Sequence, residues 1–217
     1  MQTLTDKIFK LSPPFGLFDR TVVGNIFPGI STGARKLMIH RAVVAKEVLR
    51  LKRGQYILAE EYRKSTYHPY VIASMLHAPS HISLESALSF HGLIPEAVFQ
   101  VSSVTAARSR NFDTPLGLFS FQRVPISNPR AGVEIIKLFE DSWAFIAKPL
   151  RAITDLIYLR KEISWEAHGL GFLTDSMRIE DEDLIHIDFS NFDEILEGLH
   201  NKRTVHYLKE MRKELQR

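Results

Sequence analysis

Three breaks in the first sixty residues limit how this part of the chain folds. The sequence reads Ser-Pro-Pro at positions 12–14, Pro-Gly at 28–29 and Lys-Arg-Gly at 52–54. Proline cannot continue the interior of a helix and glycine permits tight turns, so each break ends a regular element. We therefore expect short elements here, joined by turns at these three positions.

Helical spacing of apolar residues fills two of the intervals between the breaks. It predicts a helix over 3–11, and Asp19 is placed to cap a short helix that ends before the Pro-Gly pair. Ser31 or Thr32 is the expected N-cap of a third helix, which runs to about residue 46. We expect the apolar face of this third helix to consist of Ala34, Leu37, Met38, Ala42 and Ala45.

Two short runs, 48–51 and 55–58, lie on either side of the Lys-Arg-Gly break. Alternating residues around a glycine turn predict a β-hairpin with a basic tip. The order helix, helix, turn, helix, basic hairpin is that of a winged helix-turn-helix. The sequence therefore predicts such a domain over residues 1–66.

The basic residues of the chain are concentrated in this region. Residues 1–66 hold twelve Lys or Arg and five Asp or Glu, a formal charge of +7. The remaining residues hold sixteen and twenty, a formal charge of −4. A basic segment followed by an acidic one is typical of a polyanion-binding module joined to a second domain.

Double-stranded DNA is the polyanion that a winged helix-turn-helix accommodates, with the second helix of the pair in the major groove. Arg35 is the best candidate for a bidentate contact with guanine, and the hairpin is expected on the backbone or in the adjacent minor groove. The expected DNA-binding residues are Ser31, Thr32, Arg35, Lys36, His40, Arg41, Arg50, Lys52 and Arg53. A winged domain that binds a protein, or that only carries a solvated basic face, is the alternative.

Residues 67–217 are predicted to form a second domain. Alternation predicts strands over 98–105, 116–124, 132–139 and 142–147, and helical spacing predicts helices over 70–76, 84–91, 149–161 and from 192 onward. The expected fold class is α+β: an N-terminal winged helix-turn-helix followed by a mixed α/β domain with a small, mostly antiparallel sheet.

Several segments together carry a likeness to a known family. Positions 53–56 read RGQY, 81–96 HISLESALSFHGLIPE, 101–105 VSSVT, 114–117 TPLG and 147–159 AKPLRAITDLIYL. They resemble the AbiEi family, the antitoxin and regulator of the AbiE (type IV) abortive-infection toxin–antitoxin systems used in bacterial phage defence. The resemblance implies a transcriptional autorepressor that binds inverted repeats in its own promoter. It also implies that the larger domain counters a cognate nucleotidyltransferase-like toxin, directly or indirectly.

Catalytic patterns are weak in the second domain. Four histidines between positions 68 and 91 lack the spacing and cysteine partners of a zinc site, so we expect them in the core, at caps or at the surface. Ser83 lacks the glycine elbow of a hydrolase nucleophile and is interpreted as a helix N-cap. Asp155 is interpreted as structural, in a buried ion pair or a partner contact.

The acidic run 180–183, with Asp188, is expected to be solvated, because it lacks the glycine of a calcium-binding loop. Carboxylates that converge on Mg²⁺ would make a metal-dependent nuclease or phosphoryl-transfer enzyme, which is one alternative. Another is a stand-alone regulator whose second domain binds a ligand or a protein. Our leading expectation is a protein without catalytic residues, cofactor or metal.

The chain has no cysteine, which excludes disulfides and thiolate metal sites. No run of eighteen apolar residues is present, and the first residues lack a signal-peptide pattern. We therefore expect a cytoplasmic protein that does not associate with a membrane.

Overall fold

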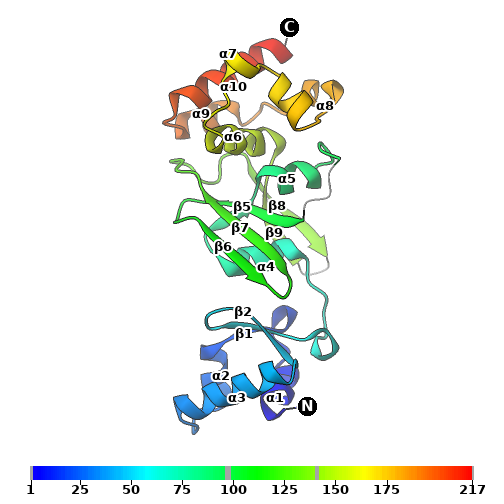
Figure 1. The fold of residues 1–217 in the computed structure, drawn as a ribbon, viewed down its shortest axis with the longest axis vertical. Helices are drawn as coiled ribbons and strands as arrows, with labels where there is room; N and C mark the ends of the chain where they lie inside the picture. Colours follow the sequence, from blue (N-terminus) through cyan, green and yellow to red (C-terminus); the bar gives the residue numbers. More distant parts are fainter. Residues whose placement is uncertain (1, 96–98, 140–141, 217) are drawn as a thin grey trace. The chain divides into compact units, whose positions relative to one another are not determined.

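A computed structural model describes residues 2–95, 99–139 and 142–216 (Figure 1). The chain divides into two compact units, one made of Met1–Pro69 with Phe112–Gly117 and the other of Tyr70–Asn111 with Leu118–Arg217. Glu96, at the end of one family-like segment, and Val98, at the start of a predicted strand, lie outside the described residues. None of the described helices combines the length and the apolar character needed to span a lipid bilayer.

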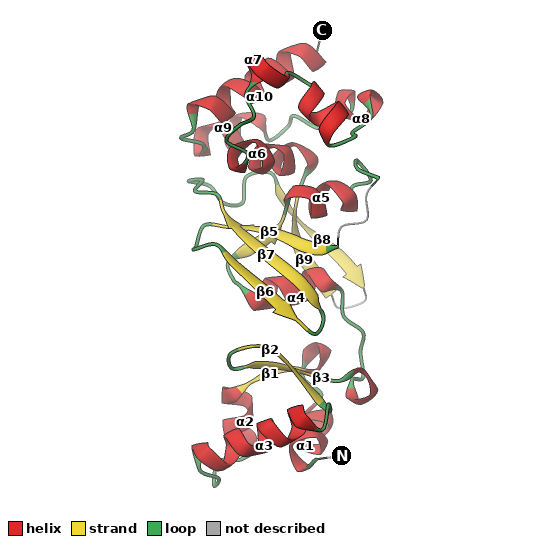
Figure 2. Cartoon of the chain, viewed as in Figure 1, coloured by secondary structure: helices red, strands yellow, loops and turns green. Residues whose placement is uncertain are grey.

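The first unit contains three α-helices and a three-stranded sheet (Figure 2). Their order is α1 (Thr3–Leu11), η1 (Pro14–Gly16), β1 (Leu17–Asp19), α2 (Arg20–Ile26), α3 (Thr32–Val44), β2 (Val48–Lys52), β3 (Gln55–Leu58) and η2 (Glu60–Tyr62). The expected caps are confirmed: Asp19 accepts from the backbone N–H of Val22 at 2.9 Å, and Ser31 accepts from that of Ala34 at 3.3 Å. Such caps satisfy N–H groups that have no partner within the helix.

The small sheet has the order β1-β3-β2 and is antiparallel throughout. The expected hairpin is confirmed, with Val48 opposite Leu58 and Lys52 opposite Gln55. Strand β1 was not expected. It pairs Leu17 with Ile57 of β3 and leads directly from η1 into α2.

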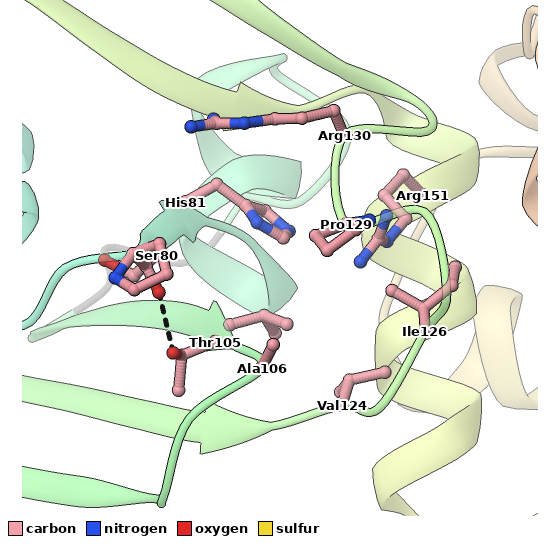
Figure 3. A pocket seen from close by; sticks show the side chains of 11 residues that line it. Ser80, His81, Thr105, Ala106, Val124, Ile126, Pro129, Arg130 and Arg151 are labelled. Atoms are coloured by element: carbon pink, nitrogen blue, oxygen red, sulfur yellow. Dashed lines mark hydrogen bonds between the residues drawn. The ribbon is translucent and has the colours of Figure 1, made fainter. Parts of the chain in front are cut away.

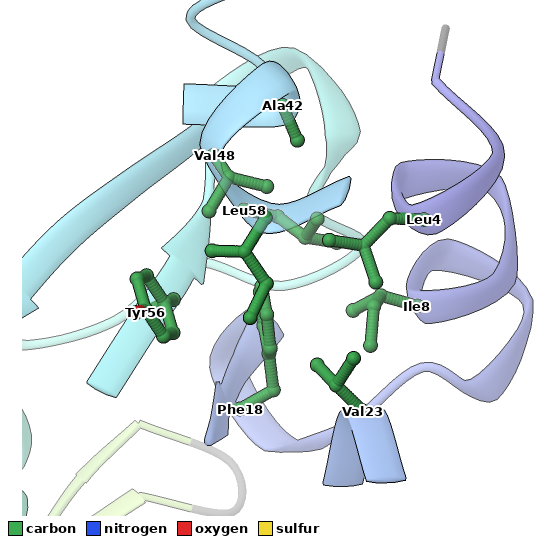
Figure 4. Close-up of a cluster of buried hydrophobic side chains, with 9 residues drawn as sticks. Leu4, Ile8, Phe18, Val23, Ala42, Val48, Tyr56 and Leu58 are labelled. Atoms are coloured by element: carbon green, nitrogen blue, oxygen red, sulfur yellow. The ribbon is translucent and has the colours of Figure 1, made fainter. Parts of the chain in front are cut away.

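A single apolar cluster lies between these helices and strands (Figure 4). Phe18 and Tyr56 stack with ring centroids 5.6 Å apart, which joins β1 to β3. Each α-helix and each strand of the unit contributes at least one side chain, so this cluster joins the helices to the sheet. Its buried members are Leu4, Ile8, Phe18, Val23, Ile39, Ala42, Val48, Tyr56 and Leu58.

The second unit is built on a six-stranded sheet of order β6-β7-β5-β4-β9-β8. The strands are β4 (Ser80–Ile82), β5 (Gln100–Thr105), β6 (Arg110–Thr114), β7 (Gly117–Arg123), β8 (Val133–Phe139) and β9 (Ser142–Ala147). Mixed α and β structure is confirmed, and the sheet contains both antiparallel and parallel pairs. Strand β4 runs parallel to β9 and β5 parallel to β7, while β4 with β5 and β8 with β9 are antiparallel.

One of the two parallel pairings involves β4, a strand that the sequence did not predict. Ser80–Ile82 is a three-residue strand inserted between β5 and β9 in the centre of the sheet. A strand this short has too few residues to show alternation. In the sheet, β4 separates β5 and β7 from the antiparallel pair of β8 and β9.

Helices gather around α6 at one end of this sheet (Figure 1). The helices of the unit are α4 (Pro69–Leu76), α5 (Leu84–Phe90), α6 (Pro149–Leu159), α7 (Trp165–His168), η3 (Phe172–Ser176), α8 (Asp181–Ile185), α9 (Phe192–Gly198) and α10 (Lys202–Leu215). Every side chain from Leu150 to Ile157 is buried, because α6 packs against α5, β9 and α10. Charged residues on α6 are therefore enclosed on all sides.

Candidate nucleic-acid interface

The face of α3 that packs against the core differs in part from the one that the sequence predicted. Ile39 and Ala42 are buried and Met38 is half-buried, as expected for a core-facing stripe. Ala34, Leu37 and Ala45 are exposed, which makes the predicted apolar face wrong at these three positions. The exposed stripe of α3 runs through Lys36, Leu37, His40, Arg41 and Val44.

Arg35 lies at the edge of this stripe, half-buried against α2. A Cβ atom on Gly24 would lie 2.8 Å from Nη1 of Arg35, so the guanidinium rests directly on the glycine. A side chain at position 24 would displace the guanidinium. The absence of a side chain at Gly24 therefore leaves the space that the Arg35 guanidinium occupies between α2 and α3.

Two adjoining hollows connect the basic residues of α3 with those of neighbouring elements. One, of about 230 Å³, is lined by Lys36 and His40 of α3, Arg50 of β2 and Arg20 of α2. The other, of about 390 Å³, is lined by Thr32, Arg35 and Lys36 of α3 and again by Arg20. We use the name α3 surface for the Arg, Lys, His and Thr residues that line the two hollows. They are Arg20, Thr21, Thr32, Arg35, Lys36, His40 and Arg50.

Arg20 is the member of the α3 surface that sequence reasoning missed. It is the first residue of α2, and its side chain reaches the hairpin turn, with Cδ and Nε 3.9 Å from the position of a Cβ on Gly54. Pairing of Asp19 with Gln55 brings the two segments together. The only sequence signal at Arg20 was its place after a capping aspartate, which says nothing about the hairpin.

The remaining expected residues do not line these hollows. Ser31 caps α3 through its hydroxyl, and Arg41 is exposed on a flank of the helix. Lys52 is half-buried at the end of β2, and Arg53 is exposed at the turn. At that turn Gly54 has φ of +87°, a conformation that residues with a side chain rarely adopt.

The α3 surface has the chemistry of an anion-binding face. Arg20, Arg35, Lys36 and Arg50 are cationic donors, and within the described part of the chain no Asp or Glu lines either hollow. Guanidinium and ammonium groups donate hydrogen bonds to phosphate oxygens, and guanidinium also matches the O6/N7 edge of guanine. An exposed helix flanked by a basic hairpin can therefore contact both the backbone and the base edges of a nucleic acid.

A second polar cluster is buried in the other unit, around Asp155. Arg151 Nε donates to its Oδ1 at 3.0 Å, and the hydroxyl of Ser83 donates to its Oδ2 at 2.7 Å. His81 Nε2 lies 3.5 Å from the same Oδ2. The expected buried ion pair at Asp155 is confirmed. Ser83 is the N-cap residue of α5, as expected, but its hydroxyl makes no capping hydrogen bond with the helix.

The geometry of this cluster does not activate Ser83 as a nucleophile. A hydroxyl nucleophile needs a base that accepts its proton, with the acid behind that base. Here the Ser83 hydroxyl donates directly to the carboxylate, and the serine is fully buried. Burial raises the pKa of Asp155, but Arg151, His81 and Ser83 together hold it below its usual value, so the acceptor stays ionised.

The acidic run of the sequence is exposed. Asp181, Glu182 and Asp183 form the first turn of α8, where they oppose the positive end of the helix dipole. Asp188 accepts from Lys148 Nζ at 3.2 Å. Within residues 2–95, 99–139 and 142–216, no three His, Asp or Glu side chains gather closely enough to hold a metal ion.

Comparisons with known proteins give no match for this chain, either among family models or among curated sequences. The likeness to the AbiEi family therefore rests on the segments quoted above and stays a prediction. Two structural features bear on function without reference to any relative. They are the α3 surface of the first unit and the polar cluster around Asp155 in the second.

Proposed function

We propose that the first unit is a winged helix-turn-helix that binds double-stranded DNA through the α3 surface. Helix α3 enters the major groove, α2 lies across the backbone, and the β2–β3 hairpin forms the wing. The observation that carries this proposal is the convergence of Arg20, Lys36, His40 and Arg50 from three elements on one hollow. Chance surface charges on separate elements rarely converge in this way.

The exposed stripe of α3 supports recognition of the base sequence as well as electrostatic attraction to the DNA backbone. Leu37 is 48% exposed between basic residues, where an apolar side chain suits the methyl group of thymine. Arg35 emerges at the start of the helix, the position from which a bidentate contact with guanine is made. The hairpin residues Arg50, Lys52 and Arg53 supply contacts to phosphate.

Fluorescence anisotropy with DNA from upstream of the gene tests the proposal. We expect binding that weakens as salt increases, with a log–log slope that falls by about 0.9 for each phosphate contact removed. Arg50→Gln should flatten the slope by about one such contact. Lys7→Gln is the matched control, because Lys7 is exposed on α1 and lines neither hollow. Absence of any salt-sensitive binding, or equal slopes for the two variants, contradicts the proposal.

We further propose that DNA binding serves autorepression in the bacterial cytoplasm and that the second unit is the antitoxin part. This step rests on the resemblance to AbiEi antitoxins and on the sequence order of the two units. Co-expression with the product of the neighbouring gene tests it. Relief of growth arrest supports the antitoxin role, and arrest that persists despite soluble expression of this chain contradicts it.

A further inference from the structure

A cavity of about 200 Å³ lies in the second unit beside the Asp155 cluster (Figure 3). Its walls come from β4, the end of β5, the loop between β7 and β8, and α6. Most of the wall is apolar, including Ala106, Val124 and Ile126. The charged or titratable side chains that line it are His81, Arg130 and Arg151.

Arg151 has one donor nitrogen left over in this wall. Its Nε donates to Asp155 and its Nη1 donates to the carbonyl oxygen of Ala131 at 2.7 Å. The whole side chain is buried, and its Nη2 has no hydrogen-bond partner in the protein. A buried guanidinium nitrogen without an acceptor is costly, so an acceptor that enters the cavity would be favoured there.

His81 adds a second polar group to the same wall. Its Nε2 is buried without a hydrogen-bond partner, since the 3.5 Å to Asp155 Oδ2 exceeds an ordinary hydrogen-bond distance. Burial lowers the pKa of His81 below its usual value, and Asp155 only partly offsets this. The imidazole is therefore a neutral donor or acceptor beside the Arg151 nitrogen (Figure 3).

The balance of charge around the cavity favours an anion. Asp155 neutralises Arg151, but Arg130 at the exposed edge has its guanidinium over the ring of Phe145, 3.5 Å from the centroid. Among the residues that the structure describes, no Asp or Glu lines the cavity. One cationic group thus remains uncompensated beside an apolar chamber that contains an unsatisfied donor.

We propose that this cavity binds a small organic monocarboxylate. One carboxylate oxygen accepts from Arg151 Nη2, Arg130 provides the compensating charge at the opening, and the apolar body of the ligand fills the space lined by Ala106, Val124 and Ile126. A dry cavity of about 150 Å³ is large enough for one benzene ring, so a single-ring or short branched-chain acid matches the size. This inference concerns the second unit alone and does not depend on DNA binding.

Isothermal titration calorimetry on the full chain tests the proposal, with benzoate, 3-methylbutanoate, benzyl alcohol and inorganic phosphate as probes. We expect one of the two carboxylates to bind saturably in the millimolar range or below, as befits a ligand of few atoms. Benzyl alcohol, which lacks the charge, and phosphate, which lacks the apolar body, should bind at least tenfold more weakly. Saturation by neither carboxylate, or tighter binding of phosphate, overturns the proposal.

Two variants, Ala106→Phe and Arg130→Gln, test whether the carboxylate binds in this cavity. Ala106 is exposed at the cavity wall, so Ala106→Phe should block the chamber without disturbing the core. Arg130→Gln should weaken carboxylate binding about tenfold, whereas Lys209→Gln, the same charge change on α10, should leave it unchanged. Undiminished binding by Ala106→Phe, or equal losses in Arg130→Gln and Lys209→Gln, overturns the assignment. Circular dichroism of each variant establishes that it is folded.

Discussion

Replacement of Asp155 by asparagine tests how the second unit is held together. The carboxylate is fully buried and accepts hydrogen bonds from Arg151 and Ser83, while His81 Nε2 lies 3.5 Å away. Asparagine has nearly the same shape and can still accept from the Ser83 hydroxyl. It removes the negative charge, so the fully buried guanidinium of Arg151 loses its counter-ion.

The expected loss of stability follows from that uncompensated charge. Removing one partner of a buried ion pair typically destabilises a protein by about 3–5 kcal/mol, because the other charge stays buried. With a urea dependence of about 2 kcal/mol per molar, the unfolding midpoint falls by about 2 M. Replacing both partners, in Arg151→Met with Asp155→Leu, should recover most of this loss, since neither charge is then left buried.

Tryptophan fluorescence during urea unfolding measures this effect in the second unit alone. The chain has two tryptophans, Trp143 on β9 and Trp165 on α7. Asp188→Asn is the matched control, because Asp188 is exposed and its ion pair with Lys148 lies at the surface. The reasoning is refuted if Asp155→Asn and Asp188→Asn shift the midpoint equally, or if the double variant is less stable than Asp155→Asn.

Three further outcomes are expected. Arg35→Ala should lower DNA affinity by about 1–3 kcal/mol and relax preference at one base position in a binding-site selection assay, in contrast to a uniform loss across sequences. Gly24→Ala should have a weaker effect of the same kind, because the new methyl group displaces the Arg35 guanidinium; selection that still matches wild type contradicts the contact between them. The free energy of unfolding should decrease as pH falls below about 6.5, the ordinary pKa of histidine, since the unfolded chain binds a proton that His81, with its lowered pKa, does not. Urea titrations of His81→Gln should show a shallower decrease over that range, with the remainder due in part to His68, whose pKa burial also lowers; an identical slope contradicts the assignment.

Local signals in the sequence were sufficient for most of the first unit. The bounds of α1, the two caps and the hairpin all depend on residues within a few positions of one another. These signals did not predict which side of α3 faces the core, because the helix has apolar residues on most of its sides. Ile39 and Val43 compete with Leu37 and Val44 for the core, and packing against α1 and β2 decides between them.

Long-range pairing accounts for what the sequence did not reveal about the sites. Ser83 and Asp155 lie 72 positions apart and meet because α5, which begins after Ser83, packs against α6. The unsatisfied nitrogen of Arg151 depends on which carbonyl and carboxylate its other nitrogens find. Neither relation has a periodicity or a spacing that a single sequence can display.

Strand β1 has a consequence for how the first unit moves. It is a three-residue strand at the edge of the sheet, and its last residue, Asp19, caps the helix that begins with Arg20. Fraying of β1 from β3 would release the cap and withdraw Arg20 from the hairpin turn in one step. The N–H of Leu17 donates to the carbonyl oxygen of Pro14 and does not take part in this pairing. Amide hydrogen exchange at the β1 N–H groups that donate to β3 therefore reports the fraction of molecules in which the α3 surface is fully assembled, and a ligand that holds this surface together should slow exchange there first.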